Sequence, residues 1–220
     1  MPQIHIALPS NLTKQHLNIL LKYFEDRDQL SSDDWKVALA SFRRLGKGII
    51  SIGKKRINFK QFYDYFVDHK YANDFISHLM ELQDLQKESE MFLQNIAFEI
   101  LERLKQEGIY QKEIANSEYL AAYCVYWWTS FARGYRFELM IFRDLQASGI
   151  TFISHNLRKR KERLSPYDLV VLNQLGDVKS TTYFLHTTQT LALNCDFYIT
   201  RLYDIQNRCY LVVVLMTEKA

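Results

Sequence analysis

The chain has 220 residues; 48% of them are hydrophobic and 24% are charged, while only 7 are glycine and 3 are proline. This composition excludes an intrinsically disordered chain, a collagen-like repeat and a small disulfide-stapled protein. A formal net charge of +3 argues against a general polyanion binder, provided that the charge is evenly spread. It is unevenly spread, so the order of the charges along the chain matters more than their sum.

Basic residues are concentrated in two stretches. Between Asp34 and Asp64 the chain has no acidic residue and a local charge of +8, whereas residues 61–130 hold 5 basic and 12 acidic residues. The basic residues of the first stretch are Lys36, Arg43, Arg44, Lys47, Lys54, Lys55, Arg56 and Lys60. The second cluster consists of Arg158, Lys159, Arg160, Lys161 and Arg163. Two such clusters favour contacts with phosphate groups, although each alone also fits a solvated loop.

The first 70 residues predict helices on both sides of one hairpin. The expected helices cover residues 11–23, 35–45 and 59–69, and the hairpin lies within residues 47–60. Ser10 or Asn11 caps the first helix, and a polar cluster at residues 31–34 caps the second. Isoleucines flank Gly53-Lys54-Lys55, so the hairpin has a basic tip.

The middle of the chain predicts longer helices. Apolar residues recur at three- and four-residue steps over residues 71–106, which indicates one long amphipathic helix or two. Gly108 is expected to end this pattern. A further helix starts near Ser117 and is expected to reach Ala147, with Gly134 as a candidate break.

The periodicity changes after Gly149, where short strands are expected. The predicted strands are residues 150–154, 169–172, 177–181, 195–202 and 209–216, with a helix over 184–193. The last strand is almost wholly apolar, as expected for a strand covered on both faces. The predicted fold class is therefore α+β, mixed α/β: a helical region over residues 1–115, followed by a core with a mixed sheet over residues 116–220.

The three cysteines, Cys124, Cys195 and Cys209, have no metal-ligand spacing and lie in apolar contexts. They are expected to be buried free thiols, which favours a reducing compartment. The N-terminus lacks the basic and apolar regions of a signal peptide, and the longest apolar run is too short to span a bilayer. We therefore expect a soluble, cytoplasmic protein with no membrane partner.

One acidic residue lies in an apolar stripe of the predicted helix 117–147. Glu138 shares a face with Phe131, Tyr135, Phe142 and Leu145, at spacings of four and three residues. A carboxylate that faces a core needs a cation, a metal or hydrogen-bond donors. A rim position, or an ion pair with an arginine such as Arg201, would also explain it.

Two acids and a lysine are expected to meet beside it. Asp168 starts one predicted strand, and Asp177 and Lys179 share a face of the next, because side chains alternate along a strand. A turn at residues 174–176 would fold the second strand back antiparallel to the first. The alternative is a turn aspartate followed by a surface Asp–Lys pair. His155, after the first strand, either approaches this site or is a hydrogen-bonded loop histidine.

Such a set of residues has a defined chemistry. Neighbouring carboxylates repel one another unless a cation lies between them, and oxygen ligands of this kind select Mg²⁺ or Mn²⁺. A bound metal lowers the pKa of a coordinated water and neutralises charge on a phosphoryl oxygen. A nearby lysine can orient that water or stabilise the transition state.

The sequence resembles the PD-(D/E)XK nuclease superfamily, which has the restriction-endonuclease-like fold, over roughly residues 131–202. The resemblance is carried by Arg133-Gly-Tyr-Arg-Phe-Glu-Leu, Gly149-Ile-Thr-Phe, Ser165-Pro-Tyr-Asp-Leu-Val-Val and Gly176-Asp-Val-Lys-Ser-Thr. It implies an αβββαβ core, which is the order found above from the residues. Two features depart from the family pattern: Tyr167 separates the proline from the aspartate, and only eight residues separate Asp168 from Asp177.

The resemblance also implies roles for individual residues. Asp168 and Asp177 would be metal ligands, the carbonyl of Val178 a further ligand, Lys179 the catalytic lysine and Glu138 the helix acid that assists the metal site. The implied activity is Mg²⁺- or Mn²⁺-dependent hydrolysis of phosphodiester bonds, in DNA rather than RNA, by an endonuclease of a restriction, repair or mobile-element type.

The two basic clusters would supply the contacts with nucleic acid. The residues assigned to this role are Lys54, Lys55, Arg56, Arg158, Lys159, Arg160, Lys161 and Arg163. The N-terminal helices would form a homodimer or bind a partner protein. One alternative is a catalytically inactive nucleic-acid-binding or assembly protein that keeps the nuclease fold. Another is a helical interaction module whose hairpin is a DNA-binding wing and whose sheet is a dimerisation platform.

Overall fold

The structure, a computed structural model, describes residues 4–26, 30–85, 88–182, 193–204 and 209–218. It is an α+β protein with two sheets, one of which is mixed. The chain divides into two compact units, residues 1–74 with 90–131 and residues 75–89 with 132–220. This division differs from the expected one between residues 115 and 116, because helix α6 (Ser117–Ala147) belongs to both units.

The elements that precede α6 follow one another closely along the chain. They are β1 (Ile4–Ala7), α1 (Lys14–Asp26), α2 (Ser32–Leu45), β2 (Ile49–Ile52), β3 (Lys55–Asn58), α3 (Phe59–Tyr63), a π-helical segment (Asp64–Asp68), α4 (His69–Glu81) and α5 (Glu88–Gln106). The pattern over residues 71–106 thus corresponds to parts of two helices. Strand β1 was not predicted from the sequence.

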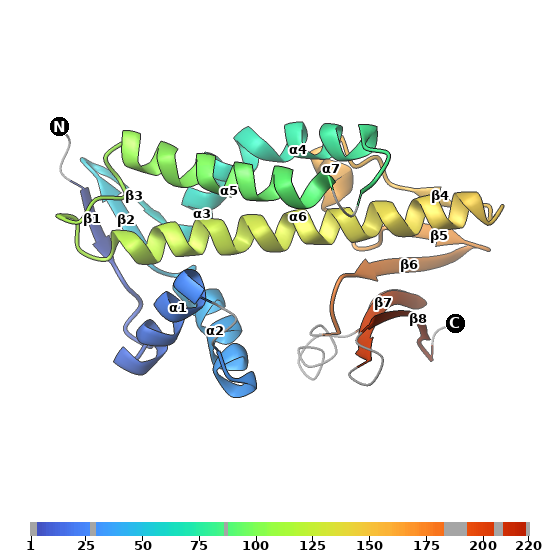
Figure 1. The fold of residues 1–220 in the computed structure, drawn as a ribbon, viewed down its shortest axis with the longest axis horizontal. Helices are drawn as coiled ribbons and strands as arrows, with labels where there is room; N and C mark the ends of the chain where they lie inside the picture. The colour runs from blue at the N-terminus through green and yellow to red at the C-terminus, as the bar shows by residue number, and fades with distance from the viewer. Residues whose placement is uncertain (1–3, 27–29, 86–87, 183–192, 205–208, 219–220) are drawn as a thin grey trace. The chain divides into compact units, whose positions relative to one another are not determined.

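The first sheet has the order β1-β2-β3 and is antiparallel throughout (Figure 1). The predicted hairpin is confirmed: Ile52 pairs with Lys55, and Gly53 turns the chain with a φ of 58°. The side chain of Ser31 accepts a hydrogen bond from the Asp34 amide at 3.1 Å and caps α2, as expected. Asn58 and Gln61 form a capping box at the start of α3.

Helix α6 has the bounds expected from the sequence and continues without a break at Gly134. Its N-terminal half contributes buried residues to the first unit, among them Leu120, Cys124 and Trp128. Among the helices that the structure describes, none combines the length and the apolar character needed to cross a bilayer.

The second unit is built on a five-stranded mixed sheet with the order β4-β5-β6-β7-β8 (Figure 1). The elements that follow α6 are β4 (Ile153–Ser154), α7 (Arg160–Arg163), β5 (Leu169–Val171), β6 (Gln174–Lys179), β7 (Phe197–Asp204) and β8 (Cys209–Met216). Strands β6 and β7 are parallel, and all other neighbours are antiparallel. Most of the helix expected over residues 184–193 falls on residues 183–192, outside the described ones.

The centre of this sheet is buried and its last strand is exposed. Leu169, Val178, Phe197 and Ile199 are all less than 10% exposed. Every residue of β8 is at least partly exposed, so the prediction that this strand is covered on both faces is wrong. The apolar sequence alone could not distinguish a central strand from an edge strand. For the same reason Cys209 is exposed, whereas Cys124 and Cys195 are buried free thiols as predicted.

Candidate metal-binding site

The β5–β6 hairpin places two aspartates opposite each other. The Asp168 amide donates to the Gly176 carbonyl at 2.9 Å, and Leu169 pairs with Gly176, so Asp168 lies across from Asp177. The turn consists of Leu172 and Asn173, with φ values of 50° and 65°, rather than of the predicted residues 174–176. A two-residue turn with two positive φ values matches the twist of a hairpin, which explains the short spacing of the acids.

Gly176 keeps the neighbouring strands close together at the site. A side chain at this position would overlap the ring of Phe197 on β7. With phenylalanine at position 197, strand β6 can therefore keep this close approach to β7 only with glycine at position 176. Asp177 follows directly, so the position of its carboxylate depends on this packing.

Asp168, Asp177 and Lys179 are held by short hydrogen bonds. Asp168 Oδ2 accepts a hydrogen bond from the Val178 amide at 2.7 Å. Lys179 Nζ donates to Asp177 Oδ1 at 2.6 Å, as expected for side chains on one face of a strand. The described contact of Val178 is made by its N–H group, and the role of its carbonyl as a metal ligand stays a prediction.

Glu138 reaches this cluster from α6 and meets His155. The residue is 6% exposed, and its Oε1 lies 2.7 Å from His155 Nε2. His155 Nδ1 lies 3.2 Å from the Tyr167 carbonyl and 3.9 Å from Asp168 Oδ1. Because a carbonyl can only accept, Nδ1 must carry a proton, and Nε2 and Glu138 then share a single proton between them.

The arginine considered as a partner for Glu138 lies elsewhere on the sheet. The guanidinium of Arg201 is 5.2 Å from the Phe137 ring centre and 4.8 Å from that of Tyr210, and its Nε donates to the Ser180 carbonyl at 2.9 Å. The buried partner of Glu138 is therefore a histidine. In the sequence, the position of His155 after a predicted strand was the one signal for this role.

Three of these side chains have the spacing of metal ligands. Glu138, His155 and Asp168 each offer one ligand atom, and the three atoms lie within 4.8 Å of one another. The hydrogen bond from Nδ1 to a carbonyl leaves Nε2 as the nitrogen that could bind a cation, once the proton it shares with Glu138 is lost. Asp177 lies beside this group, where its carboxylate is bound to Lys179.

Burial makes the carboxylates of the site hard to ionise. It raises the pKa of Glu138, which the hydrogen bond from His155 offsets only in part. Burial and the nearby Glu138 charge raise the pKa of Asp168. Burial and the neighbouring Asp168 carboxyl raise the pKa of Asp177 to about 7, although Lys179 acts in the opposite direction.

Burial and the neighbouring carboxylates also shift the pKa values of the two basic groups of the site. Burial alone would lower the pKa of Lys179, but the adjacent Asp177 and Asp168 carboxylates outweigh it and raise that pKa. Burial likewise opposes a charge on His155, yet its bond to Glu138 and the Asp168 charge raise its pKa. The three carboxyls thus disfavour one another's ionised forms, and a divalent cation between them would relieve this repulsion.

The second basic cluster lies on the loop between His155 and Asp168. Its members from Arg158 to Lys161 are exposed. The loop is held by Glu162, which accepts from the Asn156 amide at 2.6 Å and from Lys159 Nζ at 2.8 Å. Arg163 donates to the Leu157 carbonyl at 2.7 Å. The loop begins after His155 and ends before Asp168, and the His155 amide donates a hydrogen bond to the Asp168 carbonyl at 3.2 Å.

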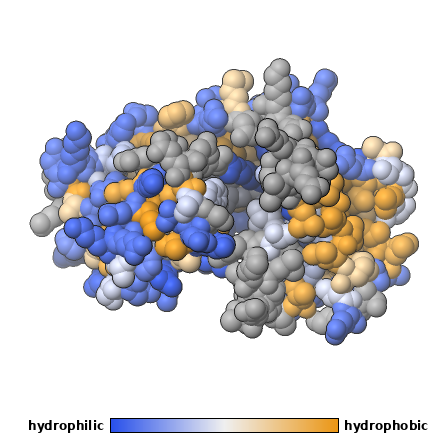
Figure 2. Space-filling view, turned by 60° about the horizontal axis from the view of Figure 1, so that its bottom comes forward, coloured by the Kyte–Doolittle hydropathy of each residue, from blue (hydrophilic) through white to orange (hydrophobic). Residues whose placement is uncertain are grey.

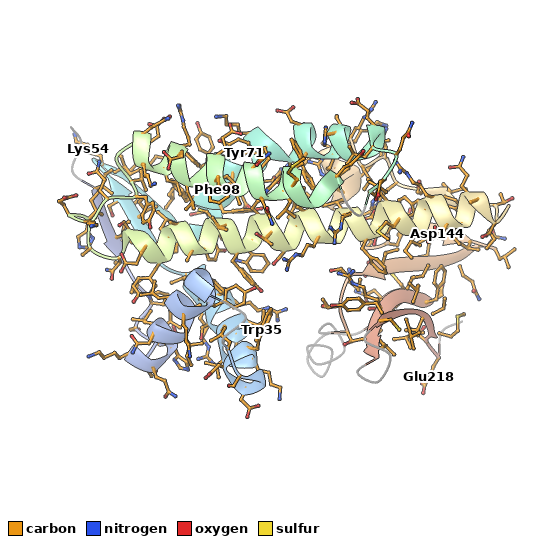
Figure 3. The ribbon with its side chains drawn as sticks, viewed as in Figure 1. Trp35, Lys54, Tyr71, Phe98, Asp144 and Glu218 are labelled. Atoms are coloured by element: carbon orange, nitrogen blue, oxygen red, sulfur yellow. The ribbon has the colours of Figure 1, made fainter. Side chains whose placement is uncertain are left out.

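The first basic cluster belongs to the other compact unit. Lys54, Lys55 and Arg56 are exposed, and Figure 3 shows Lys54 at the end of the β2–β3 hairpin. Nine residues of the basic stretch and the helices after it line a cavity of about 420 Å³. Those with basic or aromatic side chains are Arg43, Lys47, Lys60, Tyr63, Tyr123 and Trp127. The sequence showed the basic residues but gave no signal that aromatic rings lie beside them.

Comparison with known proteins adds no relative. No family model, no curated protein and no solved structure matches the chain.

Proposed function

We propose that this chain is a divalent-metal-dependent nuclease that hydrolyses phosphodiester bonds, most readily in DNA, and that its second unit has a restriction-endonuclease-like fold. The observation that carries the proposal is the convergence of Glu138, Asp168, Asp177 and Lys179 in one partly buried cluster. The order α6-β4-β5-β6-β7, with β7 parallel to β6, supports the fold.

The residues of the cluster fit a hard cation such as Mg²⁺ or Mn²⁺. Their donors are mostly carboxylate oxygens, and their pKa values are raised mainly by burial and further by the neighbouring carboxyls, whose repulsion a cation would relieve. Asp168 would hold the ion together with Asp177 from the facing strand and with Glu138 and His155, whose ligand atoms lie within 4.8 Å of that of Asp168. When bound, the cation supplies a coordinated water of lowered pKa and a positive charge next to the scissile phosphate.

The other groups position the substrate. Lys179 keeps its proton because its pKa is raised, so its ammonium group stabilises negative charge that develops on the phosphate. His155 holds the Glu138 carboxyl by the short Nε2–Oε1 bond. The exposed loop of Arg158, Lys159, Arg160 and Lys161 starts at His155 and would contact neighbouring phosphates of the strand.

Plasmid cleavage tests this proposal. The purified chain should nick supercoiled DNA with Mg²⁺ or Mn²⁺ and fail to do so with excess chelator. Asp177→Asn and Lys179→Ala should each abolish cleavage, whereas Asp144→Asn, an exposed acid on the same helix as Glu138 (Figure 3), should cleave like the wild type. Equal cleavage by wild type and both site variants would overturn the assignment. Tight DNA binding without cleavage under any metal would favour an inactive binding protein.

A further inference from the structure

Strand β8 is an edge strand without the usual protection. It is the last strand of the sheet and, among the described strands, pairs only with β7. Its sequence, CYLVVVLM, contains no charge, proline or glycine. Its register with β7 runs through eight successive pairs without a bulge. Edge strands of monomeric proteins normally carry at least one such feature, because their free backbone groups otherwise pair with another chain.

The side chains around this edge form an apolar surface. The exposed residues are Leu202 at 42%, Tyr210 at 61%, Leu211 at 49%, Val212 at 55%, Val214 at 57% and Met216 at 57%. Figure 2 shows hydrophobic side chains gathered over a continuous area of the surface. Side chains of these sizes and exposures leave on the order of 600 Å² in contact with water. That is the upper limit for the largest apolar patch of a typical monomer.

We propose that β8 is a homodimer interface, at which two copies of the chain pair their β8 strands antiparallel about a two-fold axis. The two five-stranded sheets then become one continuous sheet. This proposal does not rest on the proposed nuclease activity.

A second copy of the chain fits this edge in area and in charge. Complete burial of both patches would remove at most about 1,200 Å² from water, which is the lower end of the range for a stable specific interface. Because β8 has no charged residue, self-pairing brings no like charges together at any position. The outward N–H and C=O groups of each strand find partners in the other copy.

The symmetry also sets the register. A two-fold axis perpendicular to the sheet leaves each sheet face on the same side in both copies. Residues that pair across the axis must then point to the same face, and this requires one residue of β8 to lie opposite the same residue of the other copy. The largest overlap that meets this condition, seven of the eight residues, places Val212 or Val213 on the axis. With Val213 there, Tyr210 lies opposite Met216 and Leu211 opposite Leu215. Both registers put apolar side chains opposite each other along the strand, which gives a cross-strand contact at each position.

Sedimentation equilibrium of the full chain tests the interface. We expect a mass twice the 26.2 kDa of one chain over about 1–100 µM protein. Val212→Lys combined with Val214→Lys should halve this mass, because lysines at an edge prevent strand pairing. Ile153→Lys is the matched control: Ile153 is 72% exposed on β4, the opposite edge of the same sheet, and its variant should remain dimeric.

Two outcomes would overturn the proposal: a monomeric wild type throughout, or a double-lysine variant with the mass of the wild type. The second outcome would assign any dimer to another surface.

A crosslinking experiment covers the case in which the double-lysine variant does not fold. Cys209→Ser removes the exposed thiol and leaves the buried Cys124 and Cys195. In this background, Val212→Cys or Val213→Cys should form a disulfide-linked dimer under mild oxidation, since one of these positions lies on the axis. Ile153→Cys should stay unlinked. Failure of both β8 variants to crosslink would contradict the pairing.

Discussion

The acidic cluster and the basic clusters of this chain carry opposite charges in opposite environments. Glu138 and Asp177 are 6% and 8% exposed, and each is bound to a basic side chain at 2.7 Å or less. Lys54, Lys55 and Arg56 are exposed and project from a hairpin. A buried charge costs several kcal/mol unless it is compensated, whereas an exposed charge costs almost nothing. The buried acids are therefore the stronger indication of function, because their burial does not stabilise the fold.

The largest effect is expected at Asp168, the half-buried acid directly before β5. Asp168→Asn should lower the rate of metal-dependent DNA cleavage by about 1,000-fold or more, since it removes a charged ligand from the proposed site. Calorimetry should detect Mn²⁺ binding to the wild type and a clear loss of affinity in this variant. Asp144→Asn on the surface serves as the control. If Asp168→Asn bound Mn²⁺ as tightly as the wild type, the acids of the cluster would have no role in metal binding that distinguishes them from exposed acids.

A smaller loss is expected at the histidine that holds Glu138. His155→Ala should reduce cleavage about 10- to 100-fold, the range found for groups that orient a metal ligand. Its pH profile should also shift, because the single proton shared by Glu138 and His155 is then held by Glu138 alone. His155→Asn, which keeps a donor at this position, should recover part of the activity. If the rate and pH profile of His155→Ala were unchanged, the contact of His155 with Glu138 would be structural only.

The exposed cluster should affect binding rather than chemistry. Replacing Lys54, Lys55 and Arg56 together by alanine should weaken DNA affinity about 10-fold. It should also reduce the slope of log Kd against log salt concentration by about two to three. The melting temperature should stay within about 2 °C, because exposed charges contribute little to stability. Fluorescence anisotropy at several salt concentrations measures both quantities. A uniform loss of affinity with an unchanged salt slope would contradict phosphate contact at this hairpin.

The smallest effect is a dependence of stability on pH. Asp177 has a pKa of about 7 in the folded chain against an ordinary value of 3.8, so the folded state holds this proton more tightly than the unfolded state. The free energy of unfolding of the metal-free protein should therefore decrease by about 1–3 kcal/mol as the pH rises from 4 to above 7. The raised pKa values of Glu138, Asp168 and His155 act in the same direction.

Urea unfolding in the presence of a chelator, at pH 5 and pH 8, checks this expectation. Asp177→Asn should show a clearly smaller difference between the two pH values than the wild type, whereas Asp144→Asn should not. An identical difference in Asp177→Asn would mean that the Asp177 carboxyl is not the group that titrates.

Much of the second unit could be predicted from its residues, because local signals and long-range contacts agree there. The spacing of Glu138 in an apolar stripe and the alternation of Asp177 and Lys179 each place a side chain on a definite face. The hairpin brings Asp168 beside them whichever residues form its turn. The turn itself was mispredicted because Leu172 adopts a positive φ, which leucine rarely does.

The missed features depend on neighbours that a single segment does not specify. An apolar strand such as β8 has the same sequence pattern at the centre and at the edge of a sheet. Strand β1 is four residues long, and its pairing with β2 is decided by residues more than forty positions away. The bond between His155 and Glu138 likewise joins a loop to a helix 17 residues apart. None of these contacts produces a periodic residue pattern from which it could be predicted.

The packing of Gly176 against Phe197 links two positions that are distant in sequence but adjacent on β6 and β7. In any relative of this chain, a residue larger than glycine at position 176 would require a smaller residue at position 197. The two positions should therefore vary together, and glycine with an aromatic residue should alternate with pairs of intermediate size. Such covariation would show that the spacing between β6, which carries Asp177, and β7 is maintained, whether or not the aspartate itself is retained.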